Sequence, residues 1–224
     1  GHNATYSIPV YEGEAIPEAA NRLEIAGCTI SSQLSKKIPI ENVRAVKEKL
    51  CYVNFGGKQK NHCTSYTLPD GNVLELDAEI LSSPGVLFQP QLVIDEDYTS
   101  VMGVHEIIFN SISKLDEEIK HTIGSNIIVT GGNTLFPGFS ERLEEELNNF
   151  GNLTATPNRK FSAWIGGSIF AASSSFMERM VDKEHYDEIS STYLYSIQAA
   201  KQLSNQWPKE TNIKRPILLK NARK

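Results

Sequence analysis

The chain has 224 residues, and 40% of them are hydrophobic, which is an ordinary share for a globular protein with a buried core. Its apolar runs fall far short of the roughly 18 consecutive residues that form a transmembrane helix, so we expect no membrane-spanning segment. The formal net charge of −5 gives no reason to expect nucleic-acid binding, because the neutralisation of phosphates needs clustered Lys and Arg.

The first residues and the cysteines bear on the cellular compartment. The first residues lack the basic region and the apolar stretch of a signal peptide, so we expect none. The three cysteines, Cys28, Cys51 and Cys63, are an odd number without metal-ligand spacing. They are typical of reduced thiols in a cytosolic or nuclear protein.

The first quarter of the chain contains a strand-like segment followed by a helix-like one. Tyr6–Tyr11 is rich in aromatic and β-branched residues and ends at a Glu-Gly turn, which predicts a strand. Glu41–Val53 is predicted to be a helix, because Val43, Val46 and Leu50 recur at helical spacing.

A β-hairpin is predicted next along the chain. Thr64–Thr67 and Val73–Leu76 are strand-like, and the turn residues Leu68-Pro69-Asp70-Gly71 separate them. Because strand-like and helix-like segments alternate along the whole chain, the sequence predicts an α/β fold.

The clearest unit lies between residues 126 and 150. Ile127–Thr130 predicts a buried strand, the pair Gly131 and Gly132 breaks it, and Phe139–Phe150 predicts an amphipathic helix. We expect Ile127–Thr130 to share one sheet with Tyr6–Tyr11. Glycines between a strand and a helix let the backbone approach an anion, and free N–H groups and the helix dipole attract phosphate. A tight turn without a ligand is the other interpretation, and the motif alone leaves it open.

A second apolar helix is predicted after Gly166 and Gly167. Its apolar residues are Ile169, Phe170, Phe176 and Met180. Trp164, just before this helix, is expected in the core. The last segment, Ser190–Lys224, is polar and ends in basic residues, so we interpret it as an appendage outside the core.

Three charged residues share one face of the predicted helix 41–53. Arg44, Lys47 and Glu48 are three and four residues apart, so their side chains are neighbours. This face is either solvated, with a local ion pair, or a polar wall over a ligand with phosphates or ribose hydroxyls. Lys160 alone is typical of an exposed lysine. No histidine stands in recognisable relation to a nucleophile or in metal-ligand spacing, so the sequence indicates no catalytic group and no metal ligand.

Taken together, these segments resemble actin and the actin-related proteins, in the family's order. The matching motifs are Ile8–Gly13, Arg22–Gly27, Val43–Val53, Leu68–Gly71, Leu87–Pro90, Gly103–Glu106, Val129–Gly138 and Arg159–Ile169. The likeness covers roughly residues 1 to 188, and Arg159–Ile169 is its most specific motif.

The resemblance implies an actin-like (RNase H-like) ATPase fold of the α/β class. Residues 1–27 and 100–161 would form subdomain 3, and residues 28–99 a reduced subdomain 4. Residues 162–188 would be the C-terminal helices that return into subdomain 1. Residues 189–224 would be a polar extension that is unlike the end of actin.

The resemblance also implies a nucleotide site for ATP or ADP, with Mg²⁺ held through the nucleotide. In the family, glycines like Gly131 and Gly132 face the phosphates, and a wall like that of Lys47 and Glu48 holds the nucleoside. The residues carried over to the site are Gly27, Arg44, Lys47, Glu48, Gly131, Gly132, Asn133, Leu135, Phe136 and Lys160.

Departures from the family pattern predict weak hydrolysis. The family's N-terminal half, with its first phosphate loop, has no counterpart in this sequence. His2 replaces an expected carboxylate, and Tyr6 replaces the histidine that orients the attacking water. A phenol is a poor proton acceptor at neutral pH.

The resemblance leaves two functional classes. Thr130–Thr134, Lys160–Ser162 and Tyr6 resemble nuclear actin-related proteins, which serve in chromatin-remodelling and histone-modifying complexes. A nuclear, nucleotide-holding structural subunit is therefore favoured over a cytoplasmic one. Its partners would be other subunits of the complex, including actin or another actin-related protein, with no membrane and with nucleic acid only indirectly. The alternative is a filament-forming, ATP-hydrolysing cytoskeletal actin, which Val43–Val53 resembles closely.

Overall fold

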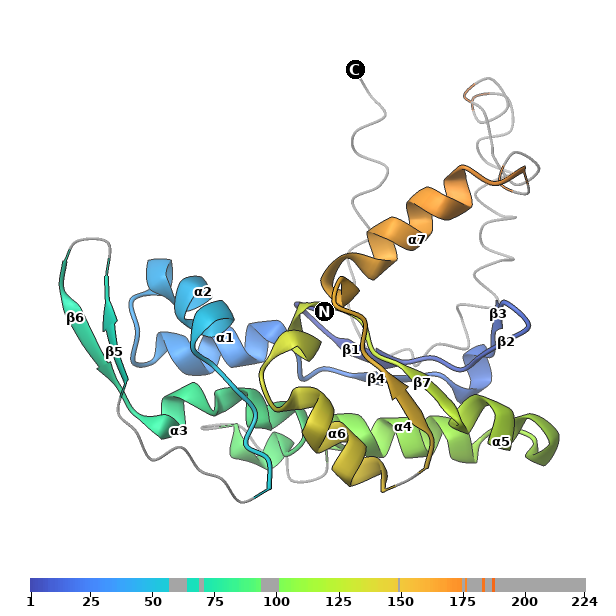
Figure 1. Ribbon diagram of the computed structural model, residues 1–224, viewed down its shortest axis with the longest axis horizontal. Helices are drawn as coiled ribbons and strands as arrows, with labels where there is room; N and C mark the ends of the chain where they lie inside the picture. Colours follow the sequence, from blue (N-terminus) through green and yellow to red (C-terminus); the bar gives the residue numbers. More distant parts are fainter. Residues whose placement is uncertain are drawn as a thin grey trace. The chain divides into compact units, whose positions relative to one another are not determined.

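The structure is a computed structural model that describes residues 1–56, 64–68, 71–93, 101–148, 150–174 and 176, together with 183 and 187. The chain divides into two compact units, Gly1–Val181 and Asp182–Lys224. Almost all of the described residues belong to the first unit, and its helices and strands are drawn in Figure 1. Cys63, Met180 and the predicted appendage 190–224 lie outside the described residues.

The described strands form two-stranded sheets. Three pairs are antiparallel: β1 (Thr5–Ser7) with β4 (Asn21–Leu23), β2 (Val10–Tyr11) with β3 (Glu14–Ala15), and β5 (Thr64–Thr67) with β6 (Val73–Leu76). The fourth pair, β7 (Asn126–Ile128) with β8 (Asn152–Thr154), is parallel. The β5–β6 pair confirms the predicted hairpin, with Thr67 opposite Val73 next to the turn.

The prediction of one continuous strand at Tyr6–Tyr11 is wrong, and so is the prediction that it shares a sheet with Ile127–Thr130. It consists of two strands, β1 and β2, that are interrupted at Ile8 and Pro9. Proline has no N–H to donate to a strand ladder, and the Pro9 carbonyl instead accepts a hydrogen bond from the Ile16 N–H at 2.9 Å. Among the described residues, β1 and β7 also lie in different sheets, so the expected common sheet is not formed.

Seven α-helices and several 3-10 turns are described. The helices are α1 (Gly27–Ser35), α2 (Ile40–Lys49), α3 (Ala78–Leu81), α4 (Val104–Ser113), α5 (Glu117–Gly124), α6 (Phe139–Leu147) and α7 (Ser162–Ala171). The 3-10 turns are η1 (Pro17–Ala19), η2 (Ser83–Leu87), η3 (Pro90–Leu92), η4 (Gly132–Leu135) and η5 (Arg159–Phe161). Within the described part of the chain, no helix is long and apolar enough to cross a membrane.

The helix predicted at 41–53 exists but ends earlier, at Lys49. The Tyr52 N–H donates to the Leu81 carbonyl at 2.9 Å, and the Val53 N–H donates to the Pro137 carbonyl at 2.8 Å. These long-range bonds take the donors that a longer helix would use, so α2 stops before them. The predicted helix 139–150 likewise ends at Leu147, because Asn148 adopts a left-handed conformation with a φ of +41°.

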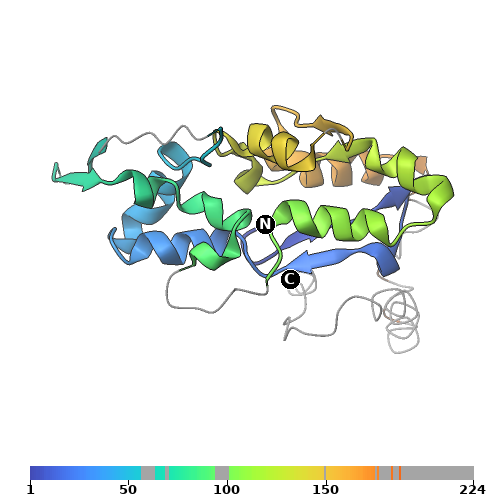
Figure 2. The same cartoon turned by 90° about the horizontal axis from the view of Figure 1, so that it is seen from below.

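One hydrophobic core holds these elements together. It includes Ile30 and Leu34 of α1, Val46 of α2, Ile107 of α4 and Leu143 of α6, all of which are almost fully buried. Helix α4 packs on β1 and β4 and also contacts α6 (Figures 1 and 2). The segments that contain the predicted site residues therefore share one hydrophobic core.

Helix α7 differs from the other helices, because none of its residues is buried. Trp164 is 76% exposed and Ile169 is 68% exposed, so the expectation that Trp164 lies in the core is wrong. The helix also begins at Ser162 and contains Gly166 and Gly167, whereas the sequence predicted a helix after them. Among the described elements, the main packing partner of α7 is η5, the 3-10 turn that directly precedes it in the chain.

Candidate functional site

A pocket of about 450 Å³ lies where α1, α2, η4 and η5 meet. Its lining residues are Gly1, His2, Gly27, Lys47, Glu48, Gly131, Gly132, Asn133, Leu135, Phe136 and Lys160. Nine of the ten residues predicted for the nucleotide site are in this set, and Arg44 is the exception. In the sequence, these nine predicted residues span 133 positions, from Gly27 to Lys160. The structure brings them together around one pocket.

The two glycines after β7 form one wall of the pocket. Gly131 has a φ of +95°, a conformation that favours glycine, and a Cβ built on it would meet no atom within 4 Å. Its N–H already donates to the Arg159 carbonyl at 2.8 Å. Gly132 is exposed and begins η4, where the first N–H groups have no partner within the turn. Gly132 is thus better placed than Gly131 to donate to a ligand.

Gly27 allows the start of α1 to approach η4 closely. A Cβ on Gly27 would lie 3.1 Å from Asn133 Oδ1 and 3.2 Å from the Gly1 carbonyl oxygen. The Gly1 carbonyl accepts hydrogen bonds from the Gly27 N–H at 3.1 Å and from Asn133 Nδ2 at 2.8 Å. A side chain at Gly27 would push these segments apart, which gives a physical reason for glycine at this position.

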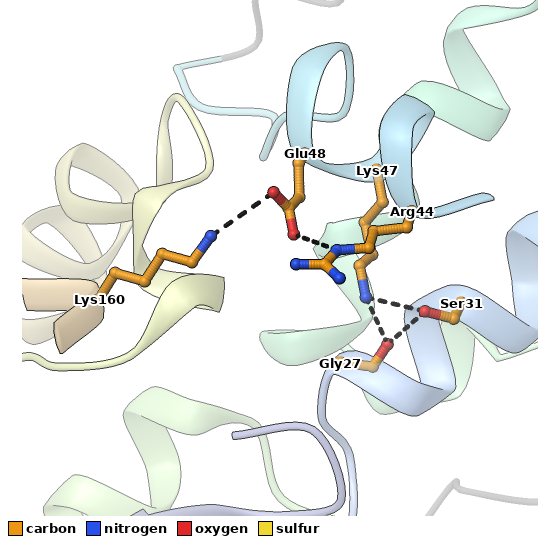
Figure 3. Close-up of polar contacts among 6 residues, drawn as sticks. All are labelled: Gly27, Ser31, Arg44, Lys47, Glu48 and Lys160. Atoms are coloured by element: carbon orange, nitrogen blue, oxygen red, sulfur yellow. Dashed lines mark hydrogen bonds and ion pairs between the residues drawn. The ribbon is translucent and has the colours of Figure 1, made fainter. Parts of the chain in front are cut away.

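Lys47 is held inside the pocket by neutral acceptors. Its Nζ donates to Ser31 Oγ at 2.8 Å and to the Gly27 carbonyl at 3.2 Å (Figure 3). Burial lowers the pKa of Lys47, and the nearby Glu48 charge partly opposes that shift. Neither of the two hydrogen-bonded oxygens carries a full charge, so the ammonium remains available to an anionic ligand.

Glu48 links both sides of the pocket. Arg44 Nε donates to Glu48 Oε1 at 3.1 Å, and Lys160 Nζ lies 3.5 Å from Glu48 Oε2 (Figure 3). The hydrogen bond from Arg44 and the charge of Lys160 lower the pKa of Glu48, so the carboxylate is ionised at neutral pH. Arg44 is itself 83% exposed and lies outside the pocket, so its observed contact is with Glu48.

Arg159 organises the pocket, although the sequence did not single it out. Its guanidinium donates to Thr134 Oγ1 and to the Thr134 carbonyl, both at 3.0 Å, and to the Thr156 carbonyl at 3.0 Å. These bonds fasten η4 to η5 and so fix Lys160 relative to Gly131. The sequence offered one signal for Arg159, which was its place next to Lys160 in the motif Arg159–Ile169.

Tyr6 is not among the residues that line this pocket. It belongs to β1 and lines a second pocket, while the guanidinium carbon of Arg22 lies 5.8 Å from the centre of its ring. His2, in contrast, lines the candidate site. Among the residues that the structure describes, no group of three or more His, Cys, Asp or Glu side chains is arranged to hold a metal ion.

Comparisons with known proteins show the family of the chain. The actin family model matches residues 40–196, a range that contains Lys47, Glu48, the Gly131–Phe136 wall and Lys160. A protein of Dictyostelium discoideum named "Putative actin-29" is 34% identical over a match that covers 85% of this chain and 56% of that relative. The chain thus spans little more than half the length of this relative. These matches confirm the predicted actin-like α/β fold, and the chain belongs to the actin family.

Proposed function

We propose that the pocket between α1, α2, η4 and η5 binds an adenine nucleotide, ATP or ADP, as one side of the nucleotide site of an actin-fold protein. The observation that carries the proposal is the meeting of Gly27, Lys47, Glu48, Gly132 and Lys160 around one pocket. Its volume of about 450 Å³ lies in the usual range of ligand pockets.

The charges and shapes in the pocket suggest how the nucleotide lies. The phosphates would face Gly132 and the Lys47 ammonium, because an exposed glycine backbone and a cation favour an anion. The nucleoside would lie between Glu48 and Leu135, since a carboxylate accepts from ribose hydroxyls and an exposed apolar side chain packs on a base. Mg²⁺ would be held through the phosphates, where it would neutralise their charge.

Entry of the nucleotide has to compete with the ion pair between Glu48 and Lys160. Both side chains are partly exposed, at 47% and 38%, and exposed pairs contribute only about 0–1 kcal/mol. A nucleoside that offers hydroxyls to Glu48 can therefore displace Lys160 at small cost. Lys160 would then contact the adenine side of the ligand.

The binding proposal is tested by titrating the chain with ATP, ADP, GTP and adenosine in the presence of Mg²⁺, with heat of binding as the readout. We expect saturable binding of ATP and ADP, and weaker binding of adenosine, which lacks the phosphates. A folded chain that binds none of these ligands at millimolar concentration would reject the proposal.

We infer that hydrolysis by the protein that contains this chain is weak. Hydrolysis needs a water in line with the γ-phosphorus and a route for its proton. Tyr6 stands at the position of the family's water-orienting histidine, and a phenol is a poor proton acceptor at neutral pH. In single-turnover assays, Tyr6→His is expected to hydrolyse ATP at least about tenfold faster. A parent protein that already hydrolyses as fast as filamentous actin would contradict this inference.

We further propose a role as a nuclear structural subunit of a multiprotein assembly, such as a chromatin-remodelling or histone-modifying complex. The exposed apolar surface of α7 supports protein partners, including actin or another actin-related protein. The alternative is a filament-forming, ATP-hydrolysing cytoskeletal actin, and the relative's printed name, "Putative actin-29", is compatible with it.

Sedimentation separates the two roles. Protein purified from its source cells would be spun in polymerising salt with and without ATP, and its location in the cell would be determined by immunofluorescence. A nuclear protein that stays in the supernatant supports the structural subunit. ATP-dependent pelleting of a cytoplasmic protein supports the cytoskeletal role.

A further inference from the structure

Ser31 contacts the candidate nucleotide site without lining its pocket. It lies on α1, and its Oγ is 2.8 Å from Lys47 Nζ on α2 (Figure 3). Lys47 is among the residues that line the pocket, and Ser31 is not. A contribution of Ser31 to ligand binding would therefore act through Lys47.

The hydrogen bonds of Ser31 fix how its hydroxyl meets Lys47. An ammonium group can only donate, so Ser31 Oγ accepts the hydrogen bond from Lys47 Nζ. The hydroxyl hydrogen is then free for the Gly27 carbonyl, which accepts it at 2.9 Å. The same carbonyl accepts a hydrogen bond from Lys47 Nζ at 3.2 Å. Ser31, Gly27 and Lys47 thus form a closed triangle of three hydrogen bonds (Figure 3).

Both helices that carry this triangle are anchored in the hydrophobic core. Helices α1 and α2 pack against each other, and Ile30 and Val46, the residues directly before Ser31 and Lys47, are fully buried. The bond from Ser31 to the Gly27 carbonyl, four residues earlier, also restricts the rotamer of the serine. Ser31 therefore offers Lys47 an acceptor in a fixed position.

The triangle keeps the charge of Lys47 available to an anion. Neither acceptor carries a full charge, and the triangle uses two of the three N–H donors of the ammonium. Glu48 follows Lys47 in the sequence, but adjacent residues of a helix do not face each other, and Figure 3 shows Glu48 directed towards Lys160. Without the Ser31 acceptor, the flexible lysine side chain would be free to turn towards the Glu48 carboxylate, which would neutralise its charge.

We propose that Ser31 is a positioning residue that directs the Lys47 ammonium to the phosphates of the nucleotide, and that it thereby sets the preference of the pocket for phosphorylated ligands over the free nucleoside. This inference rests on the proposed nucleotide-binding function and names the specificity of that site. ATP and ADP gain from the triangle, whereas adenosine has no anionic group that the ammonium could bind.

The experiment compares the parent chain with Ser31→Ala, Ser31→Thr and the control Ser35→Ala. Ser35 lies on the same helix, and its Oγ donates to the Ser32 carbonyl at 2.9 Å, so the control removes a backbone hydrogen bond of the same kind outside the triangle. Dissociation constants for ATP, ADP and adenosine are measured by calorimetric titration in the presence of Mg²⁺. Urea denaturation shows that each variant is folded.

We expect Ser31→Ala to raise the dissociation constants for ATP and ADP at least about threefold, and to change that for adenosine less than about twofold. Ser31→Thr keeps the hydroxyl and should bind ATP within about twofold of the parent, as should Ser35→Ala. When Lys47 is also replaced by alanine, the additional effect of Ser31→Ala should disappear, because no ammonium is left to position.

Three results would overturn the proposal while the nucleotide site stands. These are an unchanged constant for ATP in folded Ser31→Ala, an equal loss for adenosine and ATP, and an effect of Ser31→Ala that persists without Lys47. An equal loss would mean that the substitution loosens the whole pocket. Failure of the proposed function looks different, because the parent chain would then bind neither ATP nor ADP, and the role of Ser31 would be rejected with it.

Discussion

Lys47 is the residue at which the electrostatics of the candidate site are most directly testable. Its ammonium lines the pocket and is held by the neutral oxygens of Ser31 and Gly27. Lys47→Glu would replace attraction for phosphate by repulsion. We therefore expect the dissociation constant for ATP to rise at least about tenfold, equivalent to about 1.4 kcal/mol, as measured by calorimetric titration.

Two matched variants on the same helix control for this change. Lys49→Glu reverses an exposed charge outside the pocket, and Arg44→Ala removes a side chain that contacts Glu48 from outside. Both are expected to change the dissociation constant less than about threefold, because neither group lines the site. An unchanged constant in folded Lys47→Glu would place the nucleotide elsewhere.

Gly138 combines a left-handed backbone conformation with the close approach of another segment. It has a φ of +83°, and a Cβ on it would clash with the Val53 carbonyl oxygen. Gly138→Ala combines left-handed strain with a backbone clash, so we expect a loss of about 2–4 kcal/mol in the free energy of unfolding. Urea denaturation measures this loss.

Gly166 provides the comparison for that measurement. It lies within α7, has no positive φ, and a Cβ on it would meet no atom within 4 Å. Gly166→Ala is expected to leave stability unchanged or to raise it by up to about 1 kcal/mol through helix propensity. Equal losses of unfolding free energy in both variants would show that the clash with the Val53 carbonyl does not cause the loss in Gly138→Ala.

Among the elements, α6 and α7 differ in what their apolar residues do. Leu143 of α6 is fully buried, whereas Ile169 of α7 is 68% exposed. Leu143→Ala is therefore expected to cost about 2–5 kcal/mol of unfolding free energy, and Ile169→Ala less than about 0.5 kcal/mol. Chemical denaturation of the two variants checks this, and a large loss in Ile169→Ala would mean that α7 is packed in solution.

The existence of the elements was predictable, but their ends and partners were not. The periodicity of Val43 and Val46 predicted α2, and turn residues predicted the β5–β6 hairpin. The end of α2 depends on bonds from Tyr52 and Val53 to segments far along the chain, which no local pattern contains. The same holds for α7, whose apolar composition predicted burial that the structure does not show.

At the scale of the whole molecule, the candidate site could be predicted only through the family resemblance. The motif of Gly131 and Gly132 was compatible with a simple turn, and the charged face of α2 with a solvated surface. The fold brings these segments around one pocket. Arg44 does not line the pocket, because its guanidinium is directed to Glu48. Arg159 was not predicted, because its hydrogen bonds to Thr134 and Thr156 form only in the folded chain.

The most direct test of the account is the amide NMR spectrum of the chain during titration with MgATP. We predict saturable shifts of the Gly27 and Gly132 amides, with Lys47 and Lys160 affected alongside them, because these residues line the pocket. The Gly138 amide, which lies outside the pocket lining, should shift little and serves as an internal control. Saturable binding that leaves Gly27 and Gly132 unshifted, or shifts that cluster around β1 and β7 instead, would contradict the assignment of the nucleotide to this pocket.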